Sequence, residues 1–265
     1  MWINGVLADA LPATDRATQF GDGSFTTARV MGGKVQLLAQ HIDRLKAATE
    51  RLMIAGVDWQ ALEAEMRHAA SSCDDAVLKV ILSRGVGGRG YSPQGCHSPS
   101  RMVSLSDYPS HYHRLRQQGV RLALSPVALS QNSLLAGIKH LNRLEQVMIR
   151  LHLDQTDAHE ALVVDTEGML VECCAANIFW RKGSQVFTPE LSLAGVSGVM
   201  RNHIIHLLEE DARFNVSEVK APPETLRDAD EVIICNALMP VLPVIQAENW
   251  HFTSSTLYDF LHQVC

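Results

Sequence analysis

Glu172-Cys-Cys-Ala-Ala-Asn177-Ile-Phe179 begins the stretch of this 265-residue sequence that decides its fold. The stretch continues through Val186-Phe-Thr188 and ends in Val196-Ser-Gly-Val-Met-Arg201. It places a carboxylate in an apolar strand, a polar residue five positions later and a glycine before a helix. Because an unpaired buried carboxylate is costly, we expect Glu172 to face a cation such as a protonated ring nitrogen. Free N–H groups at a helix start at Gly198 suit a phosphate.

Lys139 adds an amine to these two features. It lies in Ala136-Gly-Ile-Lys139-His-Leu-Asn142, and the apolar residues 134–138 place it at the edge of the core. Burial there would lower the pKa of the amine and favour nucleophilic attack on an aldehyde, and the same lysine can later act as a base. An amine for an aldehyde, an acid for a ring nitrogen and a cradle for a phosphate together predict a pyridoxal 5'-phosphate (PLP) site.

Composition excludes several other classes of protein. The chain is 46% hydrophobic and 20% charged with a net charge of −6, and its basic residues do not cluster, so neither nucleic acid nor an anionic membrane is expected as a partner. No apolar run approaches the roughly 18 residues of a membrane span, and the N-terminus does not resemble a signal peptide. Six cysteines without CxxC spacing indicate reduced thiols and a cytoplasmic enzyme, and no metal site is expected.

The pattern of apolar residues predicts an α/β (α+β) protein of two domains, a smaller one at 1–113 and a larger, cofactor-binding one at 114–265. Helices are expected at 40–55, where Gly56 would end the helix, after Asp58, at 141–153 and at 198–211. Strands are expected at 2–6, 24–30, 35–38, 76–83, 102–106, 120–124, 161–164, 170–174, 178–181, 186–188 and 231–235.

Each candidate residue also has a simpler interpretation. In this interpretation, Glu172 pairs with a local arginine. Two further candidates for the site are Arg89, which would then cap a loop or pair with a surface acid, and Thr27, which would be an ordinary strand residue. Gly85-x-Gly-x-x-Gly90 fits a dinucleotide-binding pattern, but Tyr91-Ser-Pro-Gln-Gly95 cannot open the helix which that motif requires. His111-Tyr-His113 has ligand-like spacing without a third ligand nearby, so we interpret these histidines as solvated.

The stretch from Glu172 to Arg201 resembles the signature of the fold-type IV PLP enzymes, also called class IV aminotransferases. The similarity extends over the whole chain, through Phe20-Gly-Asp-Gly-Ser-Phe-Thr-Thr27, His41-x-x-Arg44-Leu45 and Cys235-Asn-Ala-Leu-Met-Pro240. It implies a two-domain fold of the D-amino-acid aminotransferase type with PLP between the domains, and a homodimer.

The resemblance also implies roles for individual residues. Lys139 would form the Schiff base and, with Thr27, serve catalysis, and Glu172 would meet the pyridine nitrogen. The remaining cofactor contacts would come from Arg44, Gly198, Val199, Met200, Asn236 and Ala237. The substrate side would be lined by Thr27, Arg89 and Asn236.

Within the family, the segments 25–29, 83–91 and 234–240 resemble lyases that form an aromatic amine and pyruvate. Branched-chain aminotransferases carry Phe-Glu-Gly where this chain has Phe25-Thr-Thr27, and a tyrosine where it has Leu144. The sequence therefore predicts a PLP-dependent lyase, with a D-amino-acid or branched-chain aminotransferase as the alternative.

Overall fold

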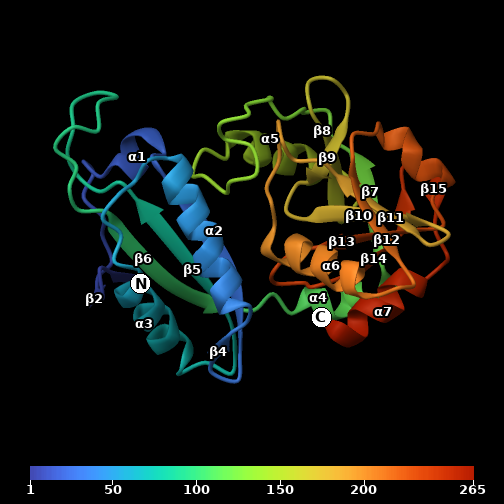
Figure 1. The fold of residues 1–265 in the computed structure, drawn as a ribbon, viewed down its shortest axis with the longest axis horizontal. Coiled ribbons are helices and arrows are strands. Elements are labelled where there is room, and N and C mark those ends of the chain that lie inside the picture. Colours follow the sequence, from blue (N-terminus) through green and yellow to red (C-terminus); the bar gives the residue numbers. More distant parts are fainter. The chain divides into compact units, whose positions relative to one another are not determined.

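The computed structural model describes residues 1–265 and divides them into two compact units, which Figure 1 shows in the colours of the sequence. Unit 1 contains Met1–Tyr108 and Ile138–Asn142, and unit 2 contains Pro109–Gly137 and Arg143–Cys265. The predicted division after residue 113 falls inside helix α4 (His111–Gln118). Both units mix helices and sheet, which confirms the predicted fold class. None of the helices combines the length and apolarity that a bilayer span requires.

Unit 1 is a six-stranded antiparallel sheet with helices on one face. The strand order is β2 (Val6–Leu7), β1 (Trp2–Ile3), β6 (Ser100–Asp107), β5 (Asp75–Ser83), β3 (Gly23–Met31) and β4 (Lys34–Val35). Helices α2 (Leu38–Arg51) and α3 (Trp59–Ala70) bury their apolar residues against alternate residues of these strands. In β3 the fully buried Thr26, Ala28 and Val30 belong to this covered side, so Phe25 and Thr27 lie on the opposite face.

Unit 2 is a nine-stranded mixed sheet. Its order is β12 (Asn215–Val219), β11 (Gln185–Pro189), β10 (Asn177–Lys182), β13 (Glu231–Cys235), β14 (Leu242–Ala247), β7 (Val120–Leu124), β8 (Glu160–Val164) and β9 (Leu170–Cys173), with β15 (Trp250–His251) beside β14. Strands β9 and β10 also contact each other, and one core cluster contains residues from both ends of this order. The sheet therefore curls around this cluster, and a second apolar cluster contains Ile149 and Leu153 of α5 (Leu144–Leu153) with Ala161 and Val163 of β8.

The helices of unit 2 lie against this sheet. They are α4, α5 (Leu144–Leu153), α6 (Val199–Glu210), α7 (Thr256–Val264) and the short 3-10 helix η1 (Pro223–Asp228). A buried ion pair at 3.0 Å between Arg181 and Glu231 lies at the start of α7, where Glu231 also accepts the N–H groups of Leu257 and Tyr258. Glu231 thus satisfies the first turn of a helix whose N-cap residue, Ser255, accepts no backbone N–H with its side chain.

Three predicted elements of unit 1 have the wrong bounds. The expected strand at 2–6 is a pair of two-residue strands, β1 and β2, because Asn4 (φ 50°) and Gly5 (φ 81°) turn the chain between them. The expected strand at 35–38 is a two-residue strand, because Leu37 adopts a left-handed conformation (φ 50°) and α2 begins at Leu38. The helix ends at Arg51 rather than near Gly56, because Met53 is also left-handed (φ 53°). The carbonyls of Leu52 and Met53 then accept hydrogen bonds at 2.7 Å from Arg84, a partner distant in sequence. A short helix, α1 (Arg16–Phe20), was not expected at all.

Strand β8 begins with a buried carboxylate. Glu160 is 6% exposed and accepts the backbone N–H groups of Ala161 at 2.9 Å and Ala175 at 3.1 Å. Burial raises its pKa from 4.5 to about 7, and these hydrogen bonds and Arg150 only partly oppose the rise. The folded protein therefore favours the protonated form of this group more strongly than the unfolded chain does.

We expect Glu160 to make the protein less stable as pH rises from about 4.5 to 7. The folded state binds more protons than the unfolded state in this window, so the free energy of unfolding falls with pH by at most about 3 kcal/mol from this group. Glu160→Gln should remove this component, measured by urea unfolding at several pH values. Glu209→Gln, at an exposed position of α6, is the control and should leave the dependence intact. An unchanged pH dependence in Glu160→Gln would contradict the interpretation.

Candidate functional site

Glu172 lies in β9 and is 5% exposed. Its Oε2 atom accepts the backbone N–H of Val196 at 2.9 Å. Gly195 makes this approach possible, because a Cβ there would lie 2.5 Å from Val171 and 3.4 Å from the Glu172 Oε2, and its φ is +85°. The carboxylate is thereby tied to the loop that leads into α6.

Arg143 also acts on Glu172, which the sequence analysis did not identify. Burial lowers the pKa of Arg143, and the charges of Glu172 and then Glu145 oppose the change. Arg143 is thus the local arginine that the simpler interpretation of Glu172 requires. It does not remove the acid from use, because a carboxylate offers two oxygens and about four lone-pair sites.

Helix α6 starts without a side-chain cap. Its N-cap residue is Gly198, no side chain accepts its first N–H groups, and its first turn contains no acidic residue. A Cβ on Gly198 would lie 2.1 Å from the Asn177 Oδ1, whose amide nitrogen donates to the carbonyl of Val196 at 2.9 Å. Glycine therefore lets the helix start approach β10, and the N–H groups of the buried Val199 and Met200 remain for an anion.

Arg201 belongs to the same helix start but has another role. It is 3% exposed, pairs with Glu218 at 2.6 Å and donates to the carbonyl of Pro189 at 2.8 Å. These bonds hold α6 to the strands β11 and β12 rather than directing a cation at a ligand.

The turn after β13 is built by Asn236. Its Oδ1 accepts the N–H groups of Leu238 and Met239, each at 2.9 Å, and its Nδ2 donates to the carbonyl of Ala175 at 3.0 Å. The side chain is therefore mostly occupied in shaping the turn, and one amide hydrogen is left for a ligand. The N–H of Ala237 bonds to no group of the chain, which suits the predicted backbone contact to a phosphate.

Lys139 belongs to unit 1, where residues 139–141 run beside the start of β3. The N–H of Phe25 donates to the carbonyl of Lys139 at 2.9 Å, and the N–H of Leu141 donates to that of Gly23 at 3.0 Å. Gly23 is required for this approach, since a Cβ there would lie 2.2 Å from the carbonyl oxygen of Leu82 and 2.9 Å from Leu141. The Lys139 amine lies 4.8 Å from the centre of the Phe25 ring.

Thr27 shares with Phe25 the face of β3 that the helices do not cover. The structure therefore brings Lys139 and Thr27 to one face of the unit 1 sheet. A second amine, on Lys79, lies 5.3 Å from the same ring, and Lys79 is the cross-strand partner of Thr27. The sequence analysis missed Lys79, which the antiparallel pairing of β3 and β5 places there.

Arg44 lies on α2 and donates a hydrogen bond to the hydroxyl of the buried Thr26. The same hydroxyl is 2.6 Å from Nδ1 of His41. Burial, and then the charge of Arg44, lower the pKa of His41 to about 3, so the ring is neutral near pH 7. The Thr26 hydroxyl, which accepts from Arg44, thus donates its own hydrogen to His41. Thr26 and His41 position Arg44, and neither was singled out from the sequence.

Arg89 lies in the loop between β5 and β6. Its side chain is exposed and makes no hydrogen bond or ion pair with any other residue. Arg89 therefore neither caps the loop nor pairs with a surface acid, so both simpler interpretations of this residue are wrong. A cation without a protein partner remains available for an anionic ligand.

The predicted site residues thus form two groups, one in each unit. Unit 1 contains Lys139, Thr27, Arg44 and Arg89, and unit 2 contains Glu172, Gly198, Val199, Met200, Asn236 and Ala237. The unit 2 group fits PLP chemically, because an uncapped helix start suits a dianionic phosphate and a buried carboxylate suits a protonated ring nitrogen.

Comparisons with known proteins agree with this chemistry. The family described as amino-transferase class IV matches residues 23–247. An aminodeoxychorismate lyase from Vibrio harveyi is 37% identical over 243 residues, which cover 92% of this chain and 89% of that protein. A crystal structure of 4-amino-4-deoxychorismate lyase from Pseudomonas aeruginosa superposes with a TM-score of 0.94 at 34% identity, covering 99% of this chain and 97% of that one.

A more distant structure shares the fold alone. It is a hypothetical aminotransferase from Mycobacterium tuberculosis in its PLP-bound form, with a TM-score of 0.83 and 19% identity over 97% of this chain and 92% of that one.

Gly198→Ala should weaken PLP binding by about 10-fold or more, because the added methyl group displaces either Asn177 or the helix start that would hold the phosphate. The backbone itself tolerates alanine, since φ is −70° at this position. Titration monitored by absorbance measures the effect. Pyridoxal, which lacks the phosphate, is the control ligand and should bind both proteins alike. The double variant with Asn177→Ala should recover part of the loss, and equal PLP affinity in Gly198→Ala would refute the phosphate assignment.

Proposed function

This chain belongs to the class IV aminotransferase family, as its sequence resemblance implies, and we propose that it is a PLP-dependent lyase. The reaction is conversion of 4-amino-4-deoxychorismate to p-aminobenzoate and pyruvate, a step that supplies folate biosynthesis. The observation that carries the proposal is the likeness to two lyases of this name along almost the whole chain, at 37% and 34% identity.

Glu172 maintains the charge on which the chemistry depends. PLP, when bound, supplies an aldehyde for the substrate amine and a protonated pyridine ring that withdraws electrons from the carbon bearing that amine. Glu172 would keep the ring nitrogen protonated, because its carboxylate is buried in an apolar strand and fixed by the Val196 N–H. A neutral residue at this position would let the ring lose its proton and its electron-withdrawing power.

Three groups bind the phosphate in this proposal. They are the start of α6 at Val199 and Met200, the N–H of Ala237, and the guanidinium of Arg44. The first two supply N–H groups that bond to no side chain of the protein. Arg44 adds positive charge, and its bond to Thr26 fixes the direction of its guanidinium.

Lys139 moves the proton. Its amine would take up the proton from C4 of the substrate ring. Loss of the C3–O bond to the enolpyruvyl group then makes the ring aromatic, and the released enolpyruvate becomes pyruvate on protonation. Thr27, on the same sheet face, donates a hydrogen bond to the reacting substrate, and Arg89 binds a substrate carboxylate.

The family is named for aminotransferases, so an aminotransferase of D-amino or branched-chain amino acids is the alternative function. Thr26 argues against the branched-chain aminotransferase, because the Phe-Glu-Gly of those enzymes would replace the hydroxyl that joins His41 to Arg44. A protein that binds PLP without turnover is a third possibility, and measured product formation separates it from the other two.

The purified protein should turn 4-amino-4-deoxychorismate into p-aminobenzoate, measured by the fluorescence of the product after separation. Lys139→Ala should lower kcat by about 10³-fold or more, because both the Schiff-base amine and the base are removed. Lys79→Ala is the matched control, since Lys79 lies beside the same Phe25 ring, and it should retain most of the rate. Robust product from Lys139→Ala, or faster amino transfer from an amino acid to pyruvate, would contradict the proposal.

We infer that the protein is a homodimer, as the family resemblance implies, with α5 in the interface. Ile149 and Leu153 anchor the helix in the core of unit 2. The opposite face exposes four large apolar side chains with helical spacing: Leu144 at 79%, Val147 at 51%, Met148 at 47% and Leu151 at 53%. Contiguous apolar patches of this kind mark interaction surfaces, and a two-fold interface uses the same patch of both copies.

Leu151→Glu should weaken the dimer by about 10-fold or more, because it places an unpaired carboxylate in an apolar interface. Sedimentation velocity at several protein concentrations measures this. Leu7→Glu, at another exposed leucine but in unit 1, is the control and should leave the dimer unchanged. A monomeric wild-type protein, or equal effects of both substitutions, would exclude α5 as the interface.

A further inference from the structure

Arg89 projects from a loop that contains no helix or regular strand. The loop connects the end of β5 at Ser83 to the start of β6 at Ser100. Five of its residues are glycines with positive φ, so the chain offers little internal stiffness. An exposed cation on such a loop would lose conformational entropy on binding a ligand unless the backbone were held by other groups.

Arg16, in helix α1, holds this backbone. Its Nη1 donates to the carbonyls of Gly90 at 3.0 Å and Ser92 at 3.4 Å, and its Nη2 donates to that of Tyr91 at 3.2 Å. One guanidinium thus binds three consecutive carbonyls directly after Arg89, which its planar set of five donors permits. Arg16 is only 4% exposed, so it is not a ligand for the substrate itself.

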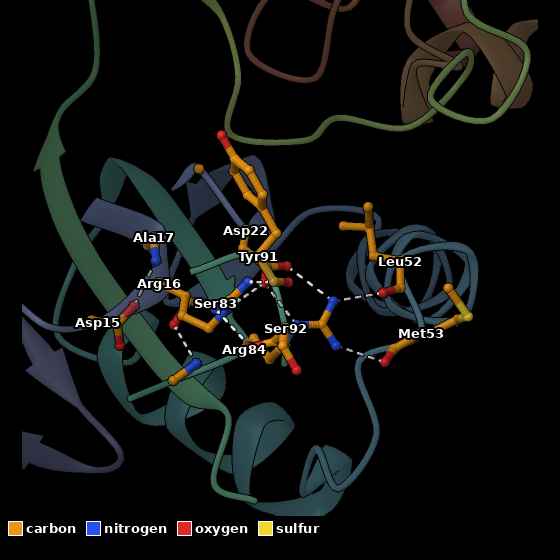
Figure 2. A network of polar contacts seen from close by, with 12 residues as sticks. Asp15, Arg16, Ala17, Asp22, Leu52, Met53, Ser83, Arg84, Tyr91 and Ser92 are labelled. Atoms are coloured by element: carbon orange, nitrogen blue, oxygen red, sulfur yellow. Dashed lines mark hydrogen bonds and ion pairs between the residues drawn. The ribbon is translucent and has the colours of Figure 1, made fainter. Parts of the chain in front are cut away.

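Asp22 fixes Arg16 in turn. Figure 2 shows its carboxylate between two guanidinium groups: Oδ2 accepts from Nε of Arg16 and from Nε of Arg84, both at 2.7 Å. Burial raises the pKa of Asp22, but the bonds and charges of Arg84 and Arg16 outweigh this and lower it overall. Asp22 is therefore ionised near neutral pH and anchors both arginines.

The turn that carries Arg89 is tightly packed against Arg16. The N–H of Ser92 donates to the carbonyl of Arg89 at 3.2 Å, which closes the turn. Gly88 has a φ of +75°, and a Cβ there would lie 2.2 Å from the carbonyl oxygen of Ser92 and 3.0 Å from the Arg16 Nη1. On the other side, the Arg16 guanidinium lies 4.7 Å from the ring of Phe20, which contacts Tyr91 at 5.6 Å between ring centres.

We propose that Arg16 is a positioning residue, which fixes the turn at residues 89–92 so that Arg89 meets a substrate carboxylate in an already ordered conformation. This inference rests on the proposed function through the role given there to Arg89. Arg16 would act only through Arg89, and its loss should affect substrate binding more than the chemical step, because its side-chain hydrogen bonds go to Asp22 and to the carbonyls of residues 90–92.

A double-mutant cycle on the PLP-loaded enzyme tests this. Arg89→Met should raise KM for 4-amino-4-deoxychorismate by about 10-fold or more. Arg16→Met, and more mildly Arg16→Lys, should raise KM several-fold with kcat within about twofold of wild type and an unchanged cofactor absorbance band. The double variant should bind substrate no worse than Arg89→Met alone, because without Arg89 the positioning has no effect.

Arg101→Met is the matched control. Arg101 lies in the same unit and pairs with Glu65 at 2.7 Å with a side chain 15% exposed, and its side-chain hydrogen bonds go to Glu65 rather than to the loop. Its loss should cost stability without changing KM. Arg16→Lys keeps the charge, so it provides a folded variant if Arg16→Met does not fold.

A separate measurement distinguishes failure of the inference from failure of the proposed function. Trypsin cleavage after Arg89 should be faster in Arg16→Lys than in wild type, whether or not the enzyme makes p-aminobenzoate. If wild type forms no product, the proposed function fails, and unchanged cleavage would then overturn the positioning role as well. If Arg89→Met raises KM but both Arg16 variants leave KM unchanged, or if the two effects add fully, the inference alone is overturned. A normal KM in Arg89→Met overturns it too.

Discussion

The proposed cofactor site of unit 2 depends on one hydrogen bond, from the Val196 N–H to Glu172. This bond joins the acid of β9 to the loop that starts α6, so residues 195–198 link the proposed partner of the ring nitrogen to the proposed phosphate contact. Gly195 and Gly198 flank this bond, and neither position has room for a Cβ. The glycines are therefore required by close approach of the backbone to Glu172 and Asn177.

In unit 1, polar side chains hold arginines in defined positions. Thr26 connects Arg44 to a neutral His41, and Asp22 connects Arg16 to Arg84. Both chains of hydrogen bonds include a residue at the start of β3, Thr26 within the strand and Asp22 directly before it. Because strand residues alternate between faces, β3 directs Thr26 toward the helices and Thr27 toward the face with Lys139. Thr26, which positions Arg44, and Thr27, which is proposed to contact the substrate, are thus neighbours in sequence but lie on opposite faces of the sheet.

The helices and strands with strong apolar periodicity were predicted well, and the polar or short ones were not. The strands at 120–124 and 231–235 match β7 and β13 residue for residue, because they carry a clear pattern of buried residues. Helix α4 was missed, since only Leu115 of its eight residues is buried, and the edge strand β12 has no buried residue. Strand β14 was also not predicted, because Pro243 interrupts its pattern of apolar residues and proline is rare in the middle of a strand. The helix at 141–153 was predicted, but the exposure of Leu144 and Leu151 became evident only in the folded unit.

The sequence by itself determined the kind of chemistry: an amine at Lys139, an acid in an apolar strand at Glu172 and a helix start at Gly198. These features are local in the sequence, so their spacing and apolar neighbours reveal them even when the residues that they contact in the fold are unknown. Only the tertiary structure decided that the Asn236 amide makes most of its hydrogen bonds within a turn and that the charges of Arg143 and Glu172 interact. The same holds for the Arg89 side chain, which has no protein partner. The tertiary structure also revealed Arg16, whose carbonyl partners lie 74 to 76 residues away in the chain. The physical reason is that one guanidinium can bond to any backbone carbonyl, so no residue type at either end encodes the pairing.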